Sequence, residues 1–169
     1  MYNIFCNVID CERNGTAHSL PGAPCGARER KIMNRHDARE AALKMIYEAS
    51  FHDEDDSVLL YKNALDSLDI KENDAYLNKL FFGVLENTAE LDEKIKENAV
   101  GWNFNRISKI SVAIMRIAIY EMKYCDDVPT NAALNEAVEL AKTYDEEKAS
   151  SFVNGVLNAV AEKEGLKSE

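Results

Sequence analysis

The sequence predicts an all-α protein of six or seven helices, and three observations support this prediction. From Met33 onward, apolar residues recur at the three- and four-residue spacing of a helix face, and no segment sustains the alternation typical of a strand. The 169 residues include only 7 Gly and 3 Pro, too few for a protein of short strands and tight turns. Connections between the helical segments are short, so consecutive helices should pack as antiparallel neighbours.

Three predicted helical segments occupy the first part of the periodic region. The first runs over about residues 34–50, and Ser57 is expected to cap a shorter second helix after an acidic loop. A long third segment ends near Gly101 and Trp102. The apolar residues that define the three faces are Ala38, Ala41, Ala42, Met45, Ile46 and Ala49, then Val58, Leu59, Tyr61, Leu65 and Leu68, then Leu77, Leu80, Phe81, Val84, Leu85, Leu91 and Ile95.

Three further helices are predicted after Gly101 and Trp102. Asn105 should cap a helix that is apolar over more than half of its circumference and therefore the most buried. Pro129 enforces a break, after which Thr130 should cap the next helix. The stripes of these helices are Ile107, Ile110, Ile114, Ile117 and Ala118, then Leu134, Ala137, Val138 and Ala141, then Ala149, Phe152, Val153, Val156, Leu157 and Val160.

Trp102 and Gly155, both in this half of the chain, are expected to have specific roles in packing. Trp102 is expected to plug the joint between two groups of helices, at about 33–100 and 101–163. Gly155 lies inside a predicted helix, where glycine costs about 1 kcal/mol relative to alanine. We expect another helix to approach it closely.

Residues 1–32 differ from the rest of the chain. They hold three of the four Cys and two of the three Pro, and they show no hydrophobic periodicity. We expect a disordered extension before a single domain over 33–169, with Met33 as the natural first residue. The alternative is a zinc site, because this segment contains Cys6, Cys11, His18 and Cys25, although their spacing is not that of paired ligand knuckles.

The formal net charge of -10 argues against binding nucleic acid through the overall electrostatic field. One basic window remains: residues 28–39 contain five Lys or Arg against Glu29 and Asp37. No run approaches the roughly 18 apolar residues of a membrane span, and the opening segment lacks the basic start of a signal peptide. We therefore expect a cytoplasmic protein without a membrane partner.

Candidate catalytic and metal residues do not form a coherent set. Asn135 and Glu136 lie beside an apolar stripe, without an accompanying nucleophile and base. His52 precedes the acidic run Asp53 to Asp56, which is typical of a solvated loop. We expect no catalytic residues, no metal and no cofactor.

Several strings, in this order and spacing, resemble the NusB family of transcription antitermination factors. The specific ones are Asn-Glu-Ala-Val-Glu-Leu-Ala-Lys over 135–142 and Phe-Val-Asn-Gly-Val-Leu over 152–157. Ile-Met-Arg-Ile-Ala-Ile-Tyr-Glu over 114–121 and Asp-Val-Pro over 127–129 support them. The resemblance covers roughly residues 33–163 and implies two packed three-helix bundles.

The resemblance also implies a function without catalysis. Members of the family bind boxA-type single-stranded RNA of ribosomal RNA leaders together with NusE, a small-subunit ribosomal protein. With other Nus factors on RNA polymerase, the pair suppresses premature termination. The alternative that the residues leave open is a helical protein-binding scaffold without RNA affinity.

The family pattern places RNA contacts at Arg35, His36 and Arg39 in the first helix and at Lys148 and Phe152 near the last. Helix N-termini attract phosphate, and Phe152 could stack on a base. The partner NusE is expected near Tyr47 and Ser111. Three positions depart from the family pattern. Asp37 interrupts the basic run. Lys148 stands at a position where relatives can carry an acid, and Ser111 stands at one where relatives often carry an acid.

Overall fold

The computed structural model describes residues 33–51, 57–68, 70, 74–146 and 148–166. The expected extension over 1–32, with its possible zinc ligands, and the acidic segment that follows Phe51 lie outside the described residues. Within these ranges the chain forms seven α-helices and one short 3-10 helix. The helices are α1 (Arg35–Ala49), α2 (Ser57–Ser67), α3 (Ala75–Glu86), α4 (Thr88–Asn98), α5 (Lys109–Tyr124), α6 (Thr130–Tyr144) and α7 (Ala149–Lys163), with the 3-10 helix at Phe104–Arg106.

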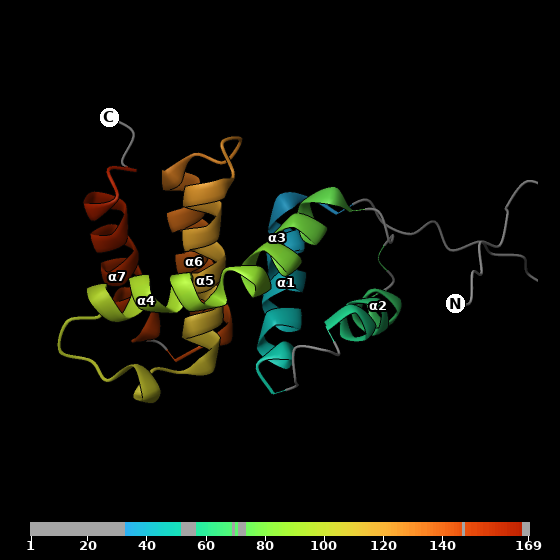
Figure 1. Cartoon of the computed structure of the whole chain (residues 1–169), viewed down its shortest axis with the longest axis horizontal. Helices are drawn as coiled ribbons and strands as arrows, with labels where there is room; N and C mark the ends of the chain where they lie inside the picture. The colour runs from blue at the N-terminus through green and yellow to red at the C-terminus, as the bar shows by residue number, and fades with distance from the viewer. Residues whose placement is uncertain (1–32, 52–56, 69, 71–73, 147, 167–169) are drawn as a thin grey trace, which may run out of the picture.

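Helix α5 is the centre of the fold, as its apolar circumference predicts. It contacts α1, α3, α4, α6 and α7. The side chains of Ile114, Met115 and Ile119 are fully buried. Figure 1 shows α1, α2 and α3 grouped on one side of the molecule and α6 and α7 on the other. One helix therefore supplies core surface to both groups.

The long third segment predicted from the sequence is two helices. Asn87 leaves helical geometry at φ -106° and ψ 12°, and its side-chain amide donates to the Gly83 carbonyl oxygen. Beyond this break α4 crosses the molecule and packs on α5 and α7. The change of helix group therefore falls at Asn87 and not at the expected joint of Gly101 and Trp102.

The helix caps differ in part from the prediction. Asn34 caps α1 and Asp74 caps α3 by accepting hydrogen bonds from backbone N–H groups. Ser108, rather than Asn105, caps α5, because Asn105 lies within the preceding 3-10 helix. Thr130 is the first residue of α6, and its hydroxyl donates to the Leu166 carbonyl oxygen. This bond attaches the segment after α7 to the start of α6.

The close approach expected at Gly155 occurs at another glycine. A Cβ atom added at Gly155 would meet no atom within 4 Å, so the prediction for this residue is wrong. A Cβ atom added at Gly83 would collide with the Tyr120 ring. Gly83 therefore allows α3 to lie against α5.

We predict opposite effects of the same substitution at these two glycines. Gly83→Ala should lower the free energy of unfolding by roughly 1 to 3 kcal/mol, because Tyr120 must move to accommodate the added methyl group. Gly155→Ala should raise it by up to about 1 kcal/mol, because alanine is the better helix former and the space is open. Urea unfolding of both variants measures this. Equal changes at the two sites would contradict the packing described for α3 and α5.

Candidate nucleic-acid interface

The start of α1 does not present all of its basic residues to solvent. Arg39 is only 5% exposed, and its Nε donates to both carboxylate oxygens of Glu121 at 2.9 and 3.0 Å. Glu121, on α5, is 1% exposed. The prediction that Arg39 meets RNA is therefore corrected: its guanidinium is buried and already paired.

Two more residues complete this buried cluster. The Tyr76 hydroxyl, from α3, donates to Glu121, and Glu136, from α6, lies 3.6 Å from a terminal nitrogen of Arg39. Burial and the hydrogen bond to Glu121 raise the pKa of Tyr76 far above its ordinary value. Burial opposes the charge of Arg39, but the hydrogen bonds and charge of Glu121 outweigh it and raise the pKa of Arg39. Both groups therefore keep their protons throughout the physiological range.

Arg35 and His36 lie at the surface above this cluster. Arg35 donates to the Asp127 carboxylate at 2.5 Å and to the Asp127 carbonyl oxygen at 3.0 Å. The Nδ1 atom of His36 lies 2.7 Å from a Glu136 carboxylate oxygen. About half of each basic side chain is exposed. Both can reach an incoming phosphate, but each already has a carboxylate partner.

Lys148 and Phe152 occupy the start of α7. Lys148 is exposed and directly precedes the helix, and Phe152 follows it by one turn. The Phe152 ring is half-buried, with its centroid 4.9 Å from that of Trp102. Trp102 is 60% exposed, so it does not plug an interior joint as the sequence suggested. A cation and two aromatic rings therefore share this part of the surface.

Tyr47 and Ser111 are the two residues expected to contact a protein partner, and of these only Tyr47 is exposed. Tyr47 is exposed on α1, and its ring meets the edge of Phe51 at a centroid distance of 5.2 Å. Ser111 is buried, and its hydroxyl donates to Asp145 at 2.5 Å. The prediction of a direct partner contact at Ser111 is therefore corrected.

Asp145 connects the start of α5 to the loop before α7. Its Oδ2 atom accepts hydrogen bonds from both Ser108 and Ser111. Burial opposes the charge of Asp145, but these hydrogen bonds lower its pKa. The carboxylate thus stays charged and fixes the loop that carries Lys148.

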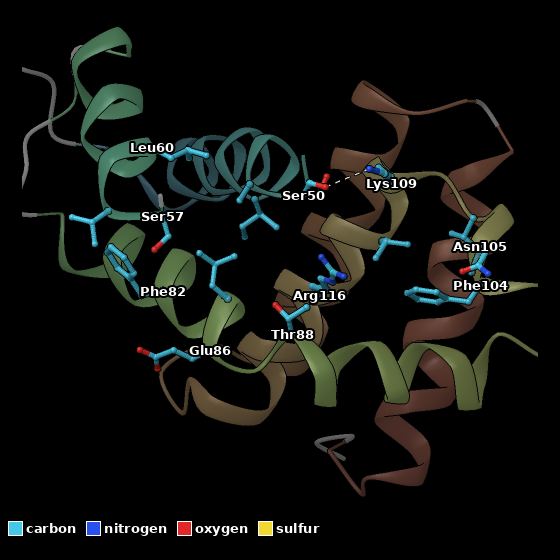
Figure 2. A pocket seen from close by; sticks show the side chains of 16 residues that line it. Ser50, Ser57, Leu60, Phe82, Glu86, Thr88, Phe104, Asn105, Lys109 and Arg116 are labelled. Atoms are coloured by element: carbon cyan, nitrogen blue, oxygen red, sulfur yellow. Dashed lines mark hydrogen bonds between the residues drawn. The ribbon is translucent and has the colours of Figure 1, made fainter. Parts of the chain in front are cut away.

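A groove of about 710 Å³ lies between the end of α1, the starts of α2 and α5, the end of α3 and the 3-10 helix. Figure 2 shows Leu60 and Phe82 on one side, Phe104 on the other, and Arg116 between them. Arg116 is itself held by Asp92 through two hydrogen bonds of 2.7 and 2.9 Å. Exposed apolar side chains stand near the groove at Phe51, Val58 and Leu59, of which Val58 lines it. The lining is mostly apolar, which suits a protein surface better than a charged ligand.

The structure does not gather all the predicted RNA contacts in one cluster. Arg35 lies against Asp127, in the loop after α5, whereas Lys148 and Phe152 lie near Ser108 and Asp145, at the start of α5. The 16 residues of α5 span roughly 24 Å at a rise of about 1.5 Å per residue. The two groups of residues are therefore near opposite ends of this helix.

Sequence reasoning missed the acidic partners and the surface position of Trp102. Glu121, Asp127 and Glu136 lie 82 to 100 residues from the basic side chains they bind, so spacing gives no signal for the pairs. A local signal did exist for Trp102. It follows Gly101, which has φ +80°, and stands in a turn between helices, where an interior position is uncommon.

The described residues contain neither a membrane-spanning helix nor a cluster of metal-ligating side chains. Among their helices, none is long and apolar enough to cross a membrane. Among the same residues, no three His, Cys, Asp or Glu side chains are grouped as metal ligands.

The sequence profile of the NusB family matches residues 36–162. The chain belongs to the NusB family. A relative from Clostridium novyi described as transcription antitermination protein NusB is 41% identical over 128 residues, which are 74% of this chain and 96% of the relative. The matched region begins at the second residue of α1 and ends one residue before the end of α7, so it includes every predicted site residue except Arg35.

Solved NusB structures share the fold. The T. maritima NusB structure aligns with a TM-score of 0.71 and 28% identity, covering 79% of this chain and 94% of the other. A structure described as antitermination factors NusB and NusE in complex with double-stranded RNA aligns with a TM-score of 0.68 and 27% identity, covering 76% and 96% of the two chains. The helical architecture is thus that of the NusB family.

We predict that Arg39 acts on stability. Arg39→Met should lower the free energy of unfolding by about 3 to 5 kcal/mol, because it leaves Glu121 buried without its cation. Adding Glu121→Leu should recover part of that loss, since the uncompensated charge is then removed. Urea unfolding of the two single variants and the double variant measures the coupling. An Arg39→Met protein with unchanged stability would contradict the buried pair.

His36 should titrate above the pKa of an unfolded histidine, because its hydrogen bond to Glu136 raises its pKa. The folded protein then holds this proton more tightly than the unfolded chain. The resulting stabilisation is full below the unfolded value of about 6.5 and is lost as the pH rises through the folded value. NMR titration of His36 should give a higher midpoint in the wild type than in Glu136→Gln. The same midpoint in both proteins would exclude this interaction in solution.

Proposed function

We propose that this protein is a transcription antitermination factor that binds boxA-type single-stranded RNA together with NusE. With other Nus factors it would support elongation by RNA polymerase, which places it in the cytoplasm. The observation that carries the proposal is the match over 96% of a relative named for antitermination. The fold shared with a NusB that was solved with NusE and RNA adds support.

The RNA surface that we propose consists of Arg35, His36, Lys148 and Phe152. The first three supply positive charge or hydrogen-bond donors at the surface, and Phe152 supplies a ring on which a base can stack. Arg39 has a positioning role, because its bond to Glu121 anchors the helix turn that carries the exposed pair. One RNA strand would contact both ends of α5.

This surface should bind RNA weakly without a partner. The chain carries a formal net charge of -10, and phosphate must compete with Asp127 for Arg35 and with Glu136 for His36. If Arg35 and Lys148 each meet one phosphate, the logarithm of the affinity should fall with the logarithm of salt at a slope near -1.4, from about -0.7 per contact. A basic ribosomal protein would neutralise acidic surface and add phosphate contacts of its own.

We propose the neighbourhood of Tyr47 as the contact for NusE. Tyr47 follows Ile46, which lines the apolar groove, and it packs on the exposed ring of Phe51. A protein that covers these side chains and enters the groove would bury apolar surface now open to water. Ser111 would act on this contact only indirectly, through the loop fixed by Asp145.

The test is a titration of labelled boxA-type RNA, single-stranded and double-stranded, with and without NusE at several salt concentrations. Arg35→Ala combined with Lys148→Ala should weaken RNA binding and flatten the salt slope toward zero, because both phosphate contacts are lost. Lys62→Ala is the matched control, since it removes an exposed cation on α2. Tyr47→Asp should weaken NusE binding measured without RNA.

Each result separates the proposed function from the alternative. NusE and RNA must tighten each other's binding by the same factor, because coupling between two sites is reciprocal. If the double variant and the wild type bind RNA equally under every condition, the RNA surface is excluded. If RNA has no effect while NusE still binds, the helical protein-binding scaffold is the better description.

A further inference from the structure

Packing of the helical core explains neither the exposed position of Trp102 nor the presence of glycine at position 155 in α7. Trp102 places a large aromatic side chain in water, although it is the only tryptophan of the 169 residues. Gly155 is inside α7, exposed, with open space where a side chain would be. Glycine is a poor helix former, so this choice needs a reason other than packing.

The position of Trp102 is held by its surroundings. Gly101 adopts φ +80°, a left-handed conformation that glycine tolerates best, and the Trp102 backbone N–H donates to the Ala99 carbonyl oxygen at 3.0 Å. The indole then packs on Phe152 at a centroid distance of 4.9 Å and an interplanar angle of 50°. Its exposed fraction of 60% leaves much of the ring free for a second contact.

Gly155 lies on the same side of α7 as Phe152 and Lys148. The intervals of three and four residues bring these positions one above another on a helix. Their order along this face is an exposed cation, a half-buried ring and a position without a side chain. The open space therefore lies one turn beyond the ring on which Trp102 packs.

We infer that Trp102 stacks on a base of the bound RNA, with Phe152 holding the indole in place and Gly155 leaving room on α7 for the adjoining nucleotide. This inference rests on the proposed function and adds Trp102 and Gly155 to its RNA surface. A nucleobase fits because every base offers a flat π face, which stacks on an aromatic ring whatever the sequence. The phosphate beside this base would meet Lys148, the exposed cation already placed in the proposed surface.

Charge alone does not select this surface for RNA. Glu146 is exposed in the same loop as Lys148, so the local balance is not strongly basic. Asp145 is turned toward Ser108 and Ser111 and is occupied there. The stacking contact should therefore contribute affinity without adding to the salt dependence of binding.

The single tryptophan gives a direct test in the unmodified full-length protein. Its fluorescence, excited where tyrosine does not absorb, should change in intensity as single-stranded boxA-type RNA is added, in step with binding. Inorganic polyphosphate supplies the negative charge without bases and should leave the signal unchanged. A signal that polyphosphate reproduces, or that RNA does not alter while it binds, would overturn stacking on Trp102.

Substitutions measure the contribution of the ring and of the open space. Trp102→Ala should weaken RNA binding by about 5- to 150-fold, equivalent to the roughly 1 to 3 kcal/mol of stacking one base, with an unchanged salt slope. Trp102→Phe should retain part of the affinity, and it replaces the alanine variant if that variant fails to fold. Gly155→Gln should also weaken binding, because its side chain fills the open space. Leu68→Ala is the control, since it removes an exposed apolar side chain directly after α2, outside both proposed contacts.

The remaining outcomes distinguish this inference from the function on which it rests. If Arg35→Ala with Lys148→Ala weakens RNA binding but Trp102→Ala does not, stacking on Trp102 is wrong and the proposed function stands. If the wild type binds no RNA with or without NusE, both fail. If Trp102→Ala weakens binding of NusE in the absence of RNA, the surface serves a protein partner and the inference is overturned.

Discussion

The buried ion pair between Arg39 and Glu121 is the interaction on which the arrangement of the helices depends. It joins the start of α1 to α5, and the hydroxyl of Tyr76 brings α3 to the same carboxylate. Burying both charges is tolerable only because each is satisfied by the other and by neighbouring polar groups. The pair therefore fixes which way α1 faces, and with it the side chains of Arg35 and His36 that remain outside. The three basic residues Arg35, His36 and Arg39 are thus divided into one structural and two surface residues.

A second polar joint has a corresponding role at the other end of α5. Asp145 binds Ser108 and Ser111 and holds the loop that leads into α7. This explains why a small hydroxyl residue suits position 111 in this fold. A carboxylate at that position would face Asp145 and repel it. The identity of residue 111 is therefore linked to the local hydrogen bonding of this chain.

Most of the fold was predictable from the sequence, because helix faces are local patterns of apolar residues. The all-α class and the central place of the helix containing Ile114 both follow from periodicity, and the structure confirms them. The break at Asn87 was missed because neither proline nor glycine marks it and the apolar face continues across it. Burial of Arg39 was missed for a different reason: its partner is 82 residues away, and an arginine at a helix start is usually exposed. The surface position of Trp102 was missed although Gly101, directly before it, is a local signal for a turn, where interior side chains are uncommon.

The carboxylates bound to Arg35 and His36 make any contact with phosphate an exchange of one anion for another. A nonspecific polyanion must displace Asp127 and Glu136 and gains only charge in return, so its net advantage is small. A ligand that also offers a flat base, or that arrives already attached to a protein partner, brings additional binding energy from elsewhere. The ion pairs of Arg35 and His36 thus lower the affinity for any anion. They favour ligands that make further contacts over ligands that offer charge alone. At the RNA surface proposed above, Arg35 and His36 would stay bound to their carboxylates until a ligand that offers both charge and a second contact binds.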